Sequence, residues 1–125
     1  MAGAPLARVR TAEGVVLCER CEVPKSSFAR MRGLLGRSGL EPGGGMLIDA
    51  APSVMTFFMR FPIDVVFLDR DRRVVRIVHA VKPWRVASAR RAVAVLELPA
   101  GRAAETGLKE GDVLALEELK TPTNG

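Results

Sequence analysis

The stretch Ile63-Asp64-Val65-Val66-Phe67-Leu68-Asp69 decides the fold class that we expect for this chain. In a β-strand, successive side chains point to opposite faces, so Ile63, Val65 and Phe67 would share one face. The residues between them are also apolar, apart from Asp64. A strand that is apolar on both faces lies between two packed layers. We therefore expect a central strand here, with the carboxylate of Asp64 at the end of a buried row.

Short apolar stretches alternate along the chain with turns that are polar or rich in Gly and Pro. The strands expected from this pattern are residues 6–10, 15–23, 46–48, 54–59, 63–69, 73–79, 92–98 and 113–116. One short helix is expected from Ser26 or Ser27 to Leu35, and one helical turn over residues 103–106. These helical patterns are too few for a doubly wound α/β fold. The sequence therefore predicts a mainly β protein: a single compact β-sandwich or jelly-roll-like domain, or a small barrel, with one short helix in its N-terminal half.

The length of the chain, 125 residues, suits one domain. We expect residues 1–116 to form this domain and residues 117–125 to form a polar, flexible C-terminal tail. The longest uncharged run, residues 50–59, has ten residues, whereas a membrane-spanning helix needs about 20. The first residues also lack the apolar run of a secretory signal peptide. The sequence therefore predicts a cytoplasmic protein without a membrane span.

The chain is basic, with 19 Lys and Arg residues, 14 Asp and Glu residues and a net charge of +5. Residues 60–102 hold ten basic and four acidic residues, so this segment could present a basic face to an anionic partner. An ordinary solvated surface is the alternative. Nucleic-acid binding is the less favoured use of this charge, because single-strand binders add stacking aromatics and this chain has no Tyr and one Trp.

Two cysteines, Cys18 and Cys21, have the spacing of a redox pair or of half a zinc site. A zinc site takes about four ligands, and the chain has no other Cys and a single His, His79. The surrounding stretch is typical of a strand, in which residues three apart point to opposite faces. We expect both cysteines to pack in the protein, with a disulfide, an intersubunit metal or redox chemistry as alternatives. No cofactor and no metal site is expected within the chain.

The buried carboxylate expected at Asp64 needs a partner, because an unpaired charge is costly to bury. Arg60 and Arg32 are candidate partners, and Thr56 could add a hydroxyl group. One interpretation is structural, an Arg–Asp pair or an Asp that caps a turn. Another is a site for an anion or a small molecule, since guanidinium groups bind carboxylates and phosphates through paired donors. A catalytic role for Asp64 is a third interpretation, without an obvious second acid or nucleophile beside it.

Three further residues complete the candidate ligand-binding set. Met59 belongs to a dense run of Phe and Met residues. The first interpretation of this run is that it forms part of the core, and the second is that it forms the wall of a pocket. Trp84 follows Pro83 in an expected loop, where it either caps the domain or serves as an exposed contact. Glu97 interrupts an apolar strand and is expected to reach solvent at the strand's end. The candidate set is therefore Arg32, Thr56, Met59, Arg60, Asp64, Trp84 and Glu97, with no catalytic or metal-binding residue assigned.

Three blocks of the sequence are distinctive: residues 32–37 (RGLLGR), 56–69 (TFFMRFPIDVVFLD) and 95–101 (VLELPAG), with Gly111-Asp112 behind them. In this order they resemble an uncharacterised prokaryotic family, domain of unknown function 192, over about residues 30–116. The resemblance implies a compact β-sandwich or jelly-roll-like fold and no established activity, cofactor or catalytic residue. The positions that match the family pattern are Arg32, Gly33, Leu34, Met59, Arg60, Asp64, Glu97 and Gly101.

Two features depart from that family pattern. Many relatives look exported, whereas this chain shows no signal segment. Relatives often carry His directly before the residue that matches Thr56, and this chain has Met55 there. The second departure counts against an enzyme.

We therefore expect a small non-enzymatic binding or accessory module. Its partner would be a small anionic ligand, or a peptide or protein. One alternative is an enzyme that uses Asp64 with Arg32 and Arg60, and a less favoured one is nucleic-acid binding through the Arg-rich middle segment. The sequence selects no oligomeric state, although unpaired edge strands could support a dimer.

Overall fold

A computed structural model of the chain describes residues 5–24, 37–51, 53–57 and 59–119. The short helix expected to end at Leu35 and the candidate residue Arg32 lie outside these residues. The described elements are β1 (Leu6–Thr11), β2 (Val16–Glu22), β3 (Gly44–Asp49), β4 (Ser53–Met55), β5 (Ile63–Leu68), β6 (Val74–Val81), β7 (Val86–Ser88), β8 (Ala94–Pro99), α2 (Arg102–Thr106) and β9 (Leu114–Glu118). Strand β9 therefore includes the first two residues of the segment that we expected as a tail.

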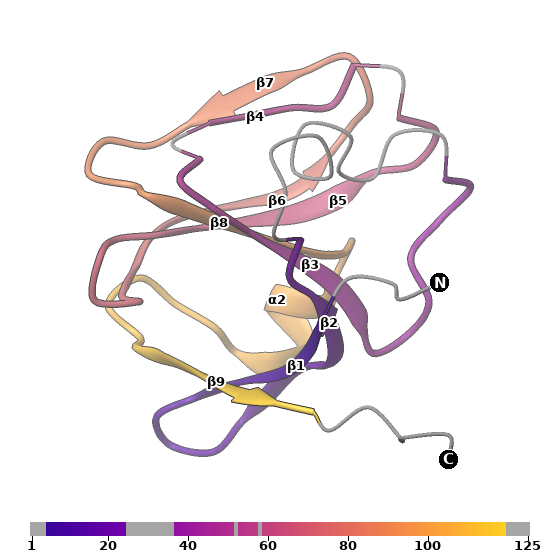
Figure 1. Ribbon diagram of the computed structural model, residues 1–125. Coiled ribbons are helices and arrows are strands. Elements are labelled where there is room, and N and C mark those ends of the chain that lie inside the picture. The colour runs from indigo at the N-terminus through magenta and orange to yellow at the C-terminus, as the bar shows by residue number, and fades with distance from the viewer. Residues whose placement is uncertain (1–4, 25–36, 52, 58, 120–125) are drawn as a thin grey trace.

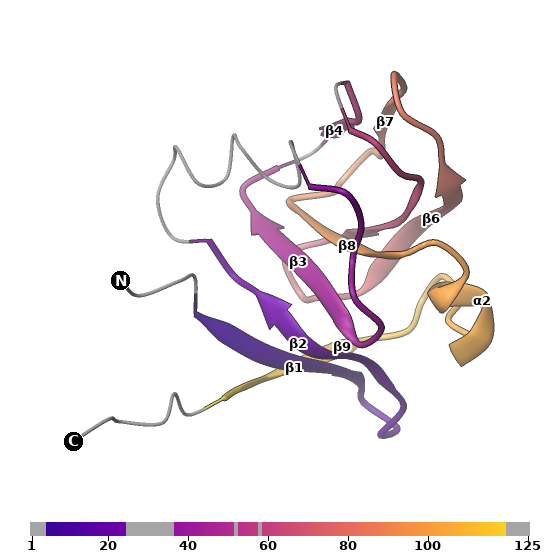
Figure 2. The ribbon, with the colours of Figure 1, turned by 90° about the vertical axis from the view of Figure 1, so that its right-hand side faces the viewer.

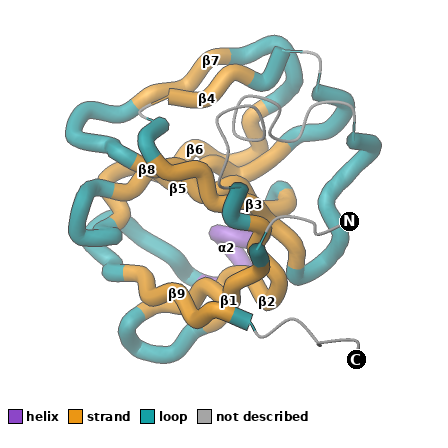
Figure 3. Tube along the Cα trace, viewed as in Figure 1, coloured by secondary structure: helices purple, strands orange, loops and turns teal. Residues whose placement is uncertain are grey.

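Seven strands form one mixed sheet in the order β6-β5-β8-β3-β2-β1-β9. All neighbouring pairs are antiparallel, except that β2 and β3 run parallel. The sheet curls, as the tube in Figure 3 shows, and an isolated bridge joins Arg73 near one edge to Val113 near the other. Within the described residues, however, no ladder pairs β6 with β9, so the sheet is not closed into a barrel. The prediction of a mainly β domain is confirmed.

A second sheet, formed by β4 and β7, lies at one end of the molecule and covers one face of the large sheet (Figures 1 and 2). Val54 of β4 and Ala87 of β7 pack against apolar side chains of the large sheet. The opposite, concave face encloses α2, whose Ala103 is fully buried. The large sheet therefore has packed layers on both faces.

These two layers explain the pattern of the deciding stretch, because all six residues of β5 are buried. One core, on the concave side, includes Val66 and Leu68 with Leu96 and Leu98 of β8. The other, under the β4–β7 sheet, includes Ile63, Val65, Phe67 and Val95. We call these the inner core and the outer core. Full burial of such a side chain stabilises the fold by about 2 kcal/mol, and the central position predicted for β5 is confirmed.

The strand expected over residues 54–59 is wrong in its length, because β4 ends at Met55. The backbone N–H of Thr56 still donates to the carbonyl oxygen of Arg85 at 2.8 Å, but the chain then turns, because the carbonyl oxygen of Thr56 accepts the N–H of Met59 at 3.2 Å. Strand β7 was not expected, since its three residues carry no alternating pattern. It forms where the chain returns beside β4.

The two cysteines share one face, which corrects the expectation that they point in opposite directions. In the β1–β2 ladder, Ala7 faces Cys21 and Val9 faces Cys18, so two steps on β1 match three on β2. This β-bulge turns both thiols into the inner core, where both are fully buried. A side-chain hydrogen bond between them lowers the pKa of Cys18 and raises that of Cys21. Both are free thiols, consistent with packing cysteines.

Candidate functional site

The β4–β7 sheet and the loops that directly adjoin it carry four of the six large apolar side chains that are exposed in the described part of the protein. Met55 is 63% exposed, Phe57 38%, Trp84 55% and Val86 61%. Met55 and Val86 face each other across the β4–β7 ladder. We call these four residues the β4–β7 patch. Single exposed apolar residues are ordinary, but a contiguous group indicates a contact surface.

The aromatic rings of Phe57 and Trp84 stack on each other, with their centroids 5.6 Å apart and their planes at 30°. Trp84 has a φ angle of 67°, in the left-handed region that bulky side chains avoid. Such a conformation costs roughly 1–2 kcal/mol. Strain of this kind persists only where surrounding contacts hold it in place, and it is concentrated at functional sites.

Thr56, which is fully buried, supplies those contacts. Its hydroxyl group donates to the carbonyl oxygen of Lys82 at 2.7 Å and accepts the backbone N–H of Arg85 at 2.9 Å. Its carbonyl oxygen accepts the N–H of Trp84 at 3.0 Å. One threonine therefore fixes both sides of the loop that presents the exposed tryptophan. The candidate residue Met59 lies behind this loop in the outer core, with 5% exposure.

The surroundings of the β4–β7 patch are basic. Arg60, Lys82 and Arg85 are all exposed. Residues 51–63 and 80–88, which form the patch and its neighbouring loops, contain these three basic residues and no acidic one. An apolar surface framed by positive charge suits a partner that carries apolar and acidic groups.

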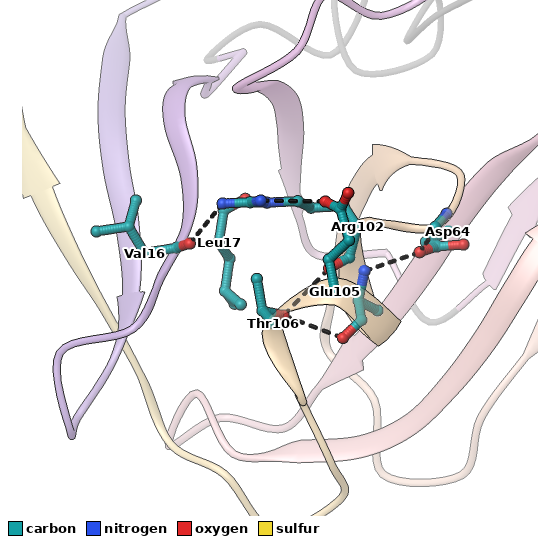
Figure 4. Close-up of polar contacts among 8 residues, drawn as sticks. Val16, Leu17, Asp64, Arg102, Glu105 and Thr106 are labelled. Carbon is teal, nitrogen blue, oxygen red and sulfur yellow. Dashed lines mark hydrogen bonds and ion pairs between the residues drawn. The ribbon is translucent and has the colours of Figure 1, made fainter.

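Asp64 lies elsewhere, at the edge of the inner core, and is fully buried. Its carboxylate accepts three backbone N–H groups, from Ala80 at 2.8 Å, Gly101 at 3.1 Å and Ala103 at 2.9 Å. Figure 4 shows the contact with the start of α2. Among the described residues, no arginine side chain donates to this carboxylate. Of the interpretations raised from the sequence, the geometry supports a structural, turn-capping aspartate.

The residue after Gly101 strengthens the same junction. Arg102 donates from Nε to the carbonyl oxygen of Leu17 at 3.1 Å and from Nη2 to that of Val16 at 2.9 Å (Figure 4). Its Nη1 pairs with Glu105 at 3.1 Å. Arg102 therefore ties α2 to β2 while Asp64 ties it to β5, so this polar cluster belongs to the scaffold.

Glu97 is 2% exposed, so the expectation that it reaches solvent is wrong. Its strand β8 lies between β3 and β5, and Glu97 faces Met46 on one side and Val65 on the other. Its Oε1 atom has no hydrogen-bond partner among the described residues. Burial raises the pKa of Glu97 to about 7, and the positive charge of Arg37 opposes this rise. A carboxylic acid in this state changes its charge near neutral pH.

The structure therefore separates the candidate residues into different places. Thr56, Met59, Arg60 and Trp84 belong to the end of the molecule that holds the β4–β7 patch, whereas Asp64 and Glu97 lie within the large sheet. The sequence missed Phe57 and Met55 as contact residues, because an apolar run reads as core, and Val86, because β7 has no pattern. The one available signal was the uncharged run 50–59 next to a loop with Trp84.

Residues 8–116 match the family DUF192, described as Uncharacterized ACR, COG1430. No curated protein matches the chain. Among the described residues, no helix has the length and hydropathy to cross a membrane.

Two solved structures are similar along most of their length. A protein of unknown function from Novosphingobium aromaticivorans DSM 12444 is 29% identical, with a TM-score of 0.75 over 88% of this chain and 83% of that chain. A protein from Sinorhizobium meliloti 1021, described as a "putative transcription regulator", is 27% identical, with a TM-score of 0.80 over 93% of this chain and 96% of that chain.

Proposed function

We propose that this chain, which belongs to the uncharacterised family DUF192, is a non-enzymatic binding module that docks a peptide or protein partner on its β4–β7 patch. The partner presents apolar side chains to Phe57 and Trp84 and acidic side chains to the basic residues around them. The observation that carries this proposal is the stacked, exposed Phe57–Trp84 pair, presented in a strained conformation by the buried Thr56.

The residue types of the patch support a contact role. Tryptophan is among the side chains that contribute most to binding when a partner covers them, and Met is enriched at protein interfaces. A stack of two rings held by a buried hydroxyl is already ordered, so less side-chain entropy is lost on binding. The scaffold beneath, with layers on both faces of the large sheet, keeps the patch in place.

The charge around the patch selects among partners. Positive residues on the rim accelerate the approach of an acidic partner and disfavour a basic one. The same residues could hold a small anionic ligand. A peptide partner is favoured because four apolar side chains would otherwise stay in water. A catalytic use of Asp64 is less favoured, because its carboxylate already accepts three backbone N–H groups. Docking on the β4–β7 patch does not need this carboxylate.

The test uses Trp84 as its own reporter, because it is the only Trp in the chain. A peptide array samples segments of about twelve residues with Leu or Phe at every third position. The other positions are Asp and Glu in one set, Lys and Arg in a second set and Ser in a third. We expect acidic peptides to shift Trp84 emission with saturation, and basic peptides to leave it unchanged. Raised salt should weaken the binding.

Matched variants locate the site. Met55→Ser and Phe57→Ala should weaken peptide binding at least tenfold, whereas Val93→Ser, at an exposed valine outside the patch, should leave it unchanged. Equal affinity for acidic and basic peptides, or equal loss in Val93→Ser, would contradict the proposal. Binding of a single-stranded oligonucleotide in place of every peptide would assign the patch to nucleic acid instead.

A further inference from the structure

One edge of the molecule carries a group of arginines that the β4–β7 patch does not use. They come from the turn between β5 and β6, the start of β6 and the loop between β7 and β8, and we call them the arginine cluster: Arg70, Arg72, Arg73, Arg76, Arg90 and Arg91. All are exposed except Arg72, which is half-buried. Figure 1 shows both connections at the same edge of the large sheet. The backbone N–H of Val93 joins them, because it donates to the carbonyl oxygen of Leu68 at 2.8 Å.

The arginine cluster keeps a net positive charge. Residues 49–51, 69–76 and 88–93, which meet at this edge, contain six arginines and three aspartates, so their net charge is +3. Asp49 pairs with Arg72 at 3.0 Å. Asp69 accepts the backbone N–H groups of the next turn residues, Asp71 and Arg73, both at 2.9 Å. Two of the three carboxylates therefore already serve the local structure.

The nearest acidic loop lies on the other side of the sheet. Residues 109–112 include two acidic residues and follow α2, where the preceding Leu108 packs in the inner core. Arg76 points to the opposite side, because it is level with Phe67 of the outer core. Its Nη1 atom donates to the carbonyl oxygen of Ser88 in β7. The positive charge of Arg76 therefore lies on the side that the β4–β7 sheet covers.

Two members of the arginine cluster occupy backbone positions that ordinarily take glycine or asparagine. Arg91 has a φ angle of 68° and is the third residue of a turn in which the N–H of Ala92 donates to the carbonyl oxygen of Ala89 at 3.3 Å. Arg72 has a φ angle of 62° and closes a turn with the carbonyl oxygen of Asp69 at 3.0 Å. A side chain in this left-handed region is strained. Strain of this kind is concentrated at functional sites.

The chemistry of the arginine cluster favours phosphate groups on a polymer. A guanidinium group binds phosphate oxygens through two parallel donors, which an ammonium group does not offer. A single ion pair in water is weak, so exposed arginines bind well only where several anionic groups meet them together and release counterions. Residues 69–76 and 88–93 contain no aromatic side chain, whereas proteins that bind single strands stack bases on aromatic rings. A double helix, with its bases stacked inside and its phosphates outside, needs no such rings.

We propose that the arginine cluster binds the phosphate backbone of a nucleic-acid duplex without reading its base sequence. This surface is independent of peptide docking on the β4–β7 patch. Arg70, Arg90 and Arg91 lie in the turns and contact the phosphates. Arg72 and Arg76 add charge and also hold the edge together, through Asp49 of β3 and Ser88 of β7. Contacts to phosphates position a protein on the duplex and carry no sequence information directly.

The experiment measures binding of the full chain to a labelled DNA duplex of about 20 base pairs, roughly two helical turns, by fluorescence anisotropy. We expect saturable binding that does not change when the base sequence is shuffled. Between about 50 and 200 mM salt the logarithm of the binding constant should fall linearly with the logarithm of salt concentration, with a slope of roughly 0.9 for each phosphate contacted. An RNA duplex of the same length distinguishes the two sources of a duplex, and binding of either one supports the proposal. A single strand of the same length should bind more weakly.

Variants at Arg91 separate function from stability. Arg91→Gly relieves the left-handed strain, so it should unfold at a temperature no lower than the wild type. It should nevertheless bind the duplex at least threefold more weakly, with a salt slope reduced by about 1. Arg91→Lys keeps the charge and should restore most of that slope. Arg20→Gln, at an exposed arginine of β2 outside the cluster, should bind as the wild type does.

A second pair of variants keeps this surface distinct from the β4–β7 patch. The double variant Arg90→Gln/Arg91→Gln should lose at least tenfold in duplex affinity and retain binding of acidic peptides. Phe57→Ala should retain duplex binding. Either surface can therefore fail without the other.

Four results would overturn the proposal. They are no duplex binding at low salt, unchanged duplex affinity in the Arg90→Gln/Arg91→Gln variant, tighter binding of the single strand than of either duplex, and displacement of the duplex by polyglutamate at equal charge. Binding of phosphatidylglycerol vesicles in place of any duplex would assign the arginine cluster to a membrane surface and would also overturn it.

Discussion

The carboxylate of Asp64 in β5 accepts the backbone N–H of Gly101 at 3.1 Å, although 37 residues separate them in the chain. Gly101 has a φ angle of 94°, a conformation that a side chain would strain. The same carboxylate binds Ala80, which also has a positive φ, of 49°. Asp64 therefore holds two unusual backbone turns together at one corner of the sheet.

Replacement of Asp64 should destabilise the protein. Asp64→Asn keeps the size of the side chain but replaces one acceptor by an amide that faces backbone N–H groups. We expect the free energy of unfolding to fall by about 3 kcal/mol, since hydrogen bonds to a buried charge contribute about 1.5–3 kcal/mol. Urea unfolding measures this change. Asp71→Asn, at an exposed turn aspartate, is the control, and an equally small effect of both variants would remove the structural role of Asp64.

The stability of the protein should depend on pH through Glu97. Its pKa is raised from 4.5 to about 7, so the folded state holds the proton more tightly than the unfolded state. The stabilising contribution is fully present below pH 4.5 and is lost as pH rises through 7. A rise of this size corresponds to about 3 kcal/mol.

Glu97→Gln removes this titration. At pH 8 the variant should be more stable than the wild type by about 1–3 kcal/mol, and its free energy of unfolding should vary less between pH 5 and 8. Denaturant unfolding at several pH values measures both profiles. Parallel profiles for the two proteins would show that another group carries the dependence.

Gly45 should not tolerate a side chain. A Cβ atom there would lie 2.8 Å from the carbonyl oxygen of Glu97 and 2.9 Å from Sγ of Cys18. We expect Gly45→Ala to lower the free energy of unfolding by about 2 kcal/mol, because β3 and β8 would have to move apart. Gly39→Ala, where the added atom meets open space, should change stability little. Equal melting temperatures of the two variants would contradict the close approach of these strands.

The strain at Trp84 can be measured directly. Its φ angle of 67° is acceptable for glycine but unfavourable for alanine. Trp84→Gly should therefore be more stable than Trp84→Ala by roughly 1 kcal/mol, although glycine ordinarily destabilises a folded chain. Chemical denaturation of the two variants measures the difference. If Trp84→Ala is the more stable of the two, the loop does not impose a left-handed conformation at this position.

The local pattern of apolar and polar residues was sufficient to predict most of the strands. The stretch Ile63–Leu68 is apolar at successive positions, and a strand of that kind can only lie between two layers. The same pattern explains why Asp64 was expected to be buried. The helical turn over residues 103–106 was also expected, and it corresponds to α2, Arg102–Thr106.

The candidate site was harder to predict from the sequence than the strands were. Trp84 and Thr56 were singled out as residues, but their relationship depends on hydrogen bonds between positions 26 to 29 residues apart. Phe57 was read as core because an apolar residue in an apolar run is usually buried. Only the return of the chain through β7 leaves it exposed beside Trp84.

Sequence by itself determined the class of fold and the central strand, because alternation and burial of side chains are properties of neighbouring residues. Tertiary structure alone decided the partners of Asp64, the common face of Cys18 and Cys21, and the burial of Glu97. Each of these depends on strand register, on a bulge or on a strand's place within the sheet. Those features arise from pairing between distant segments, which no local pattern of residues specifies.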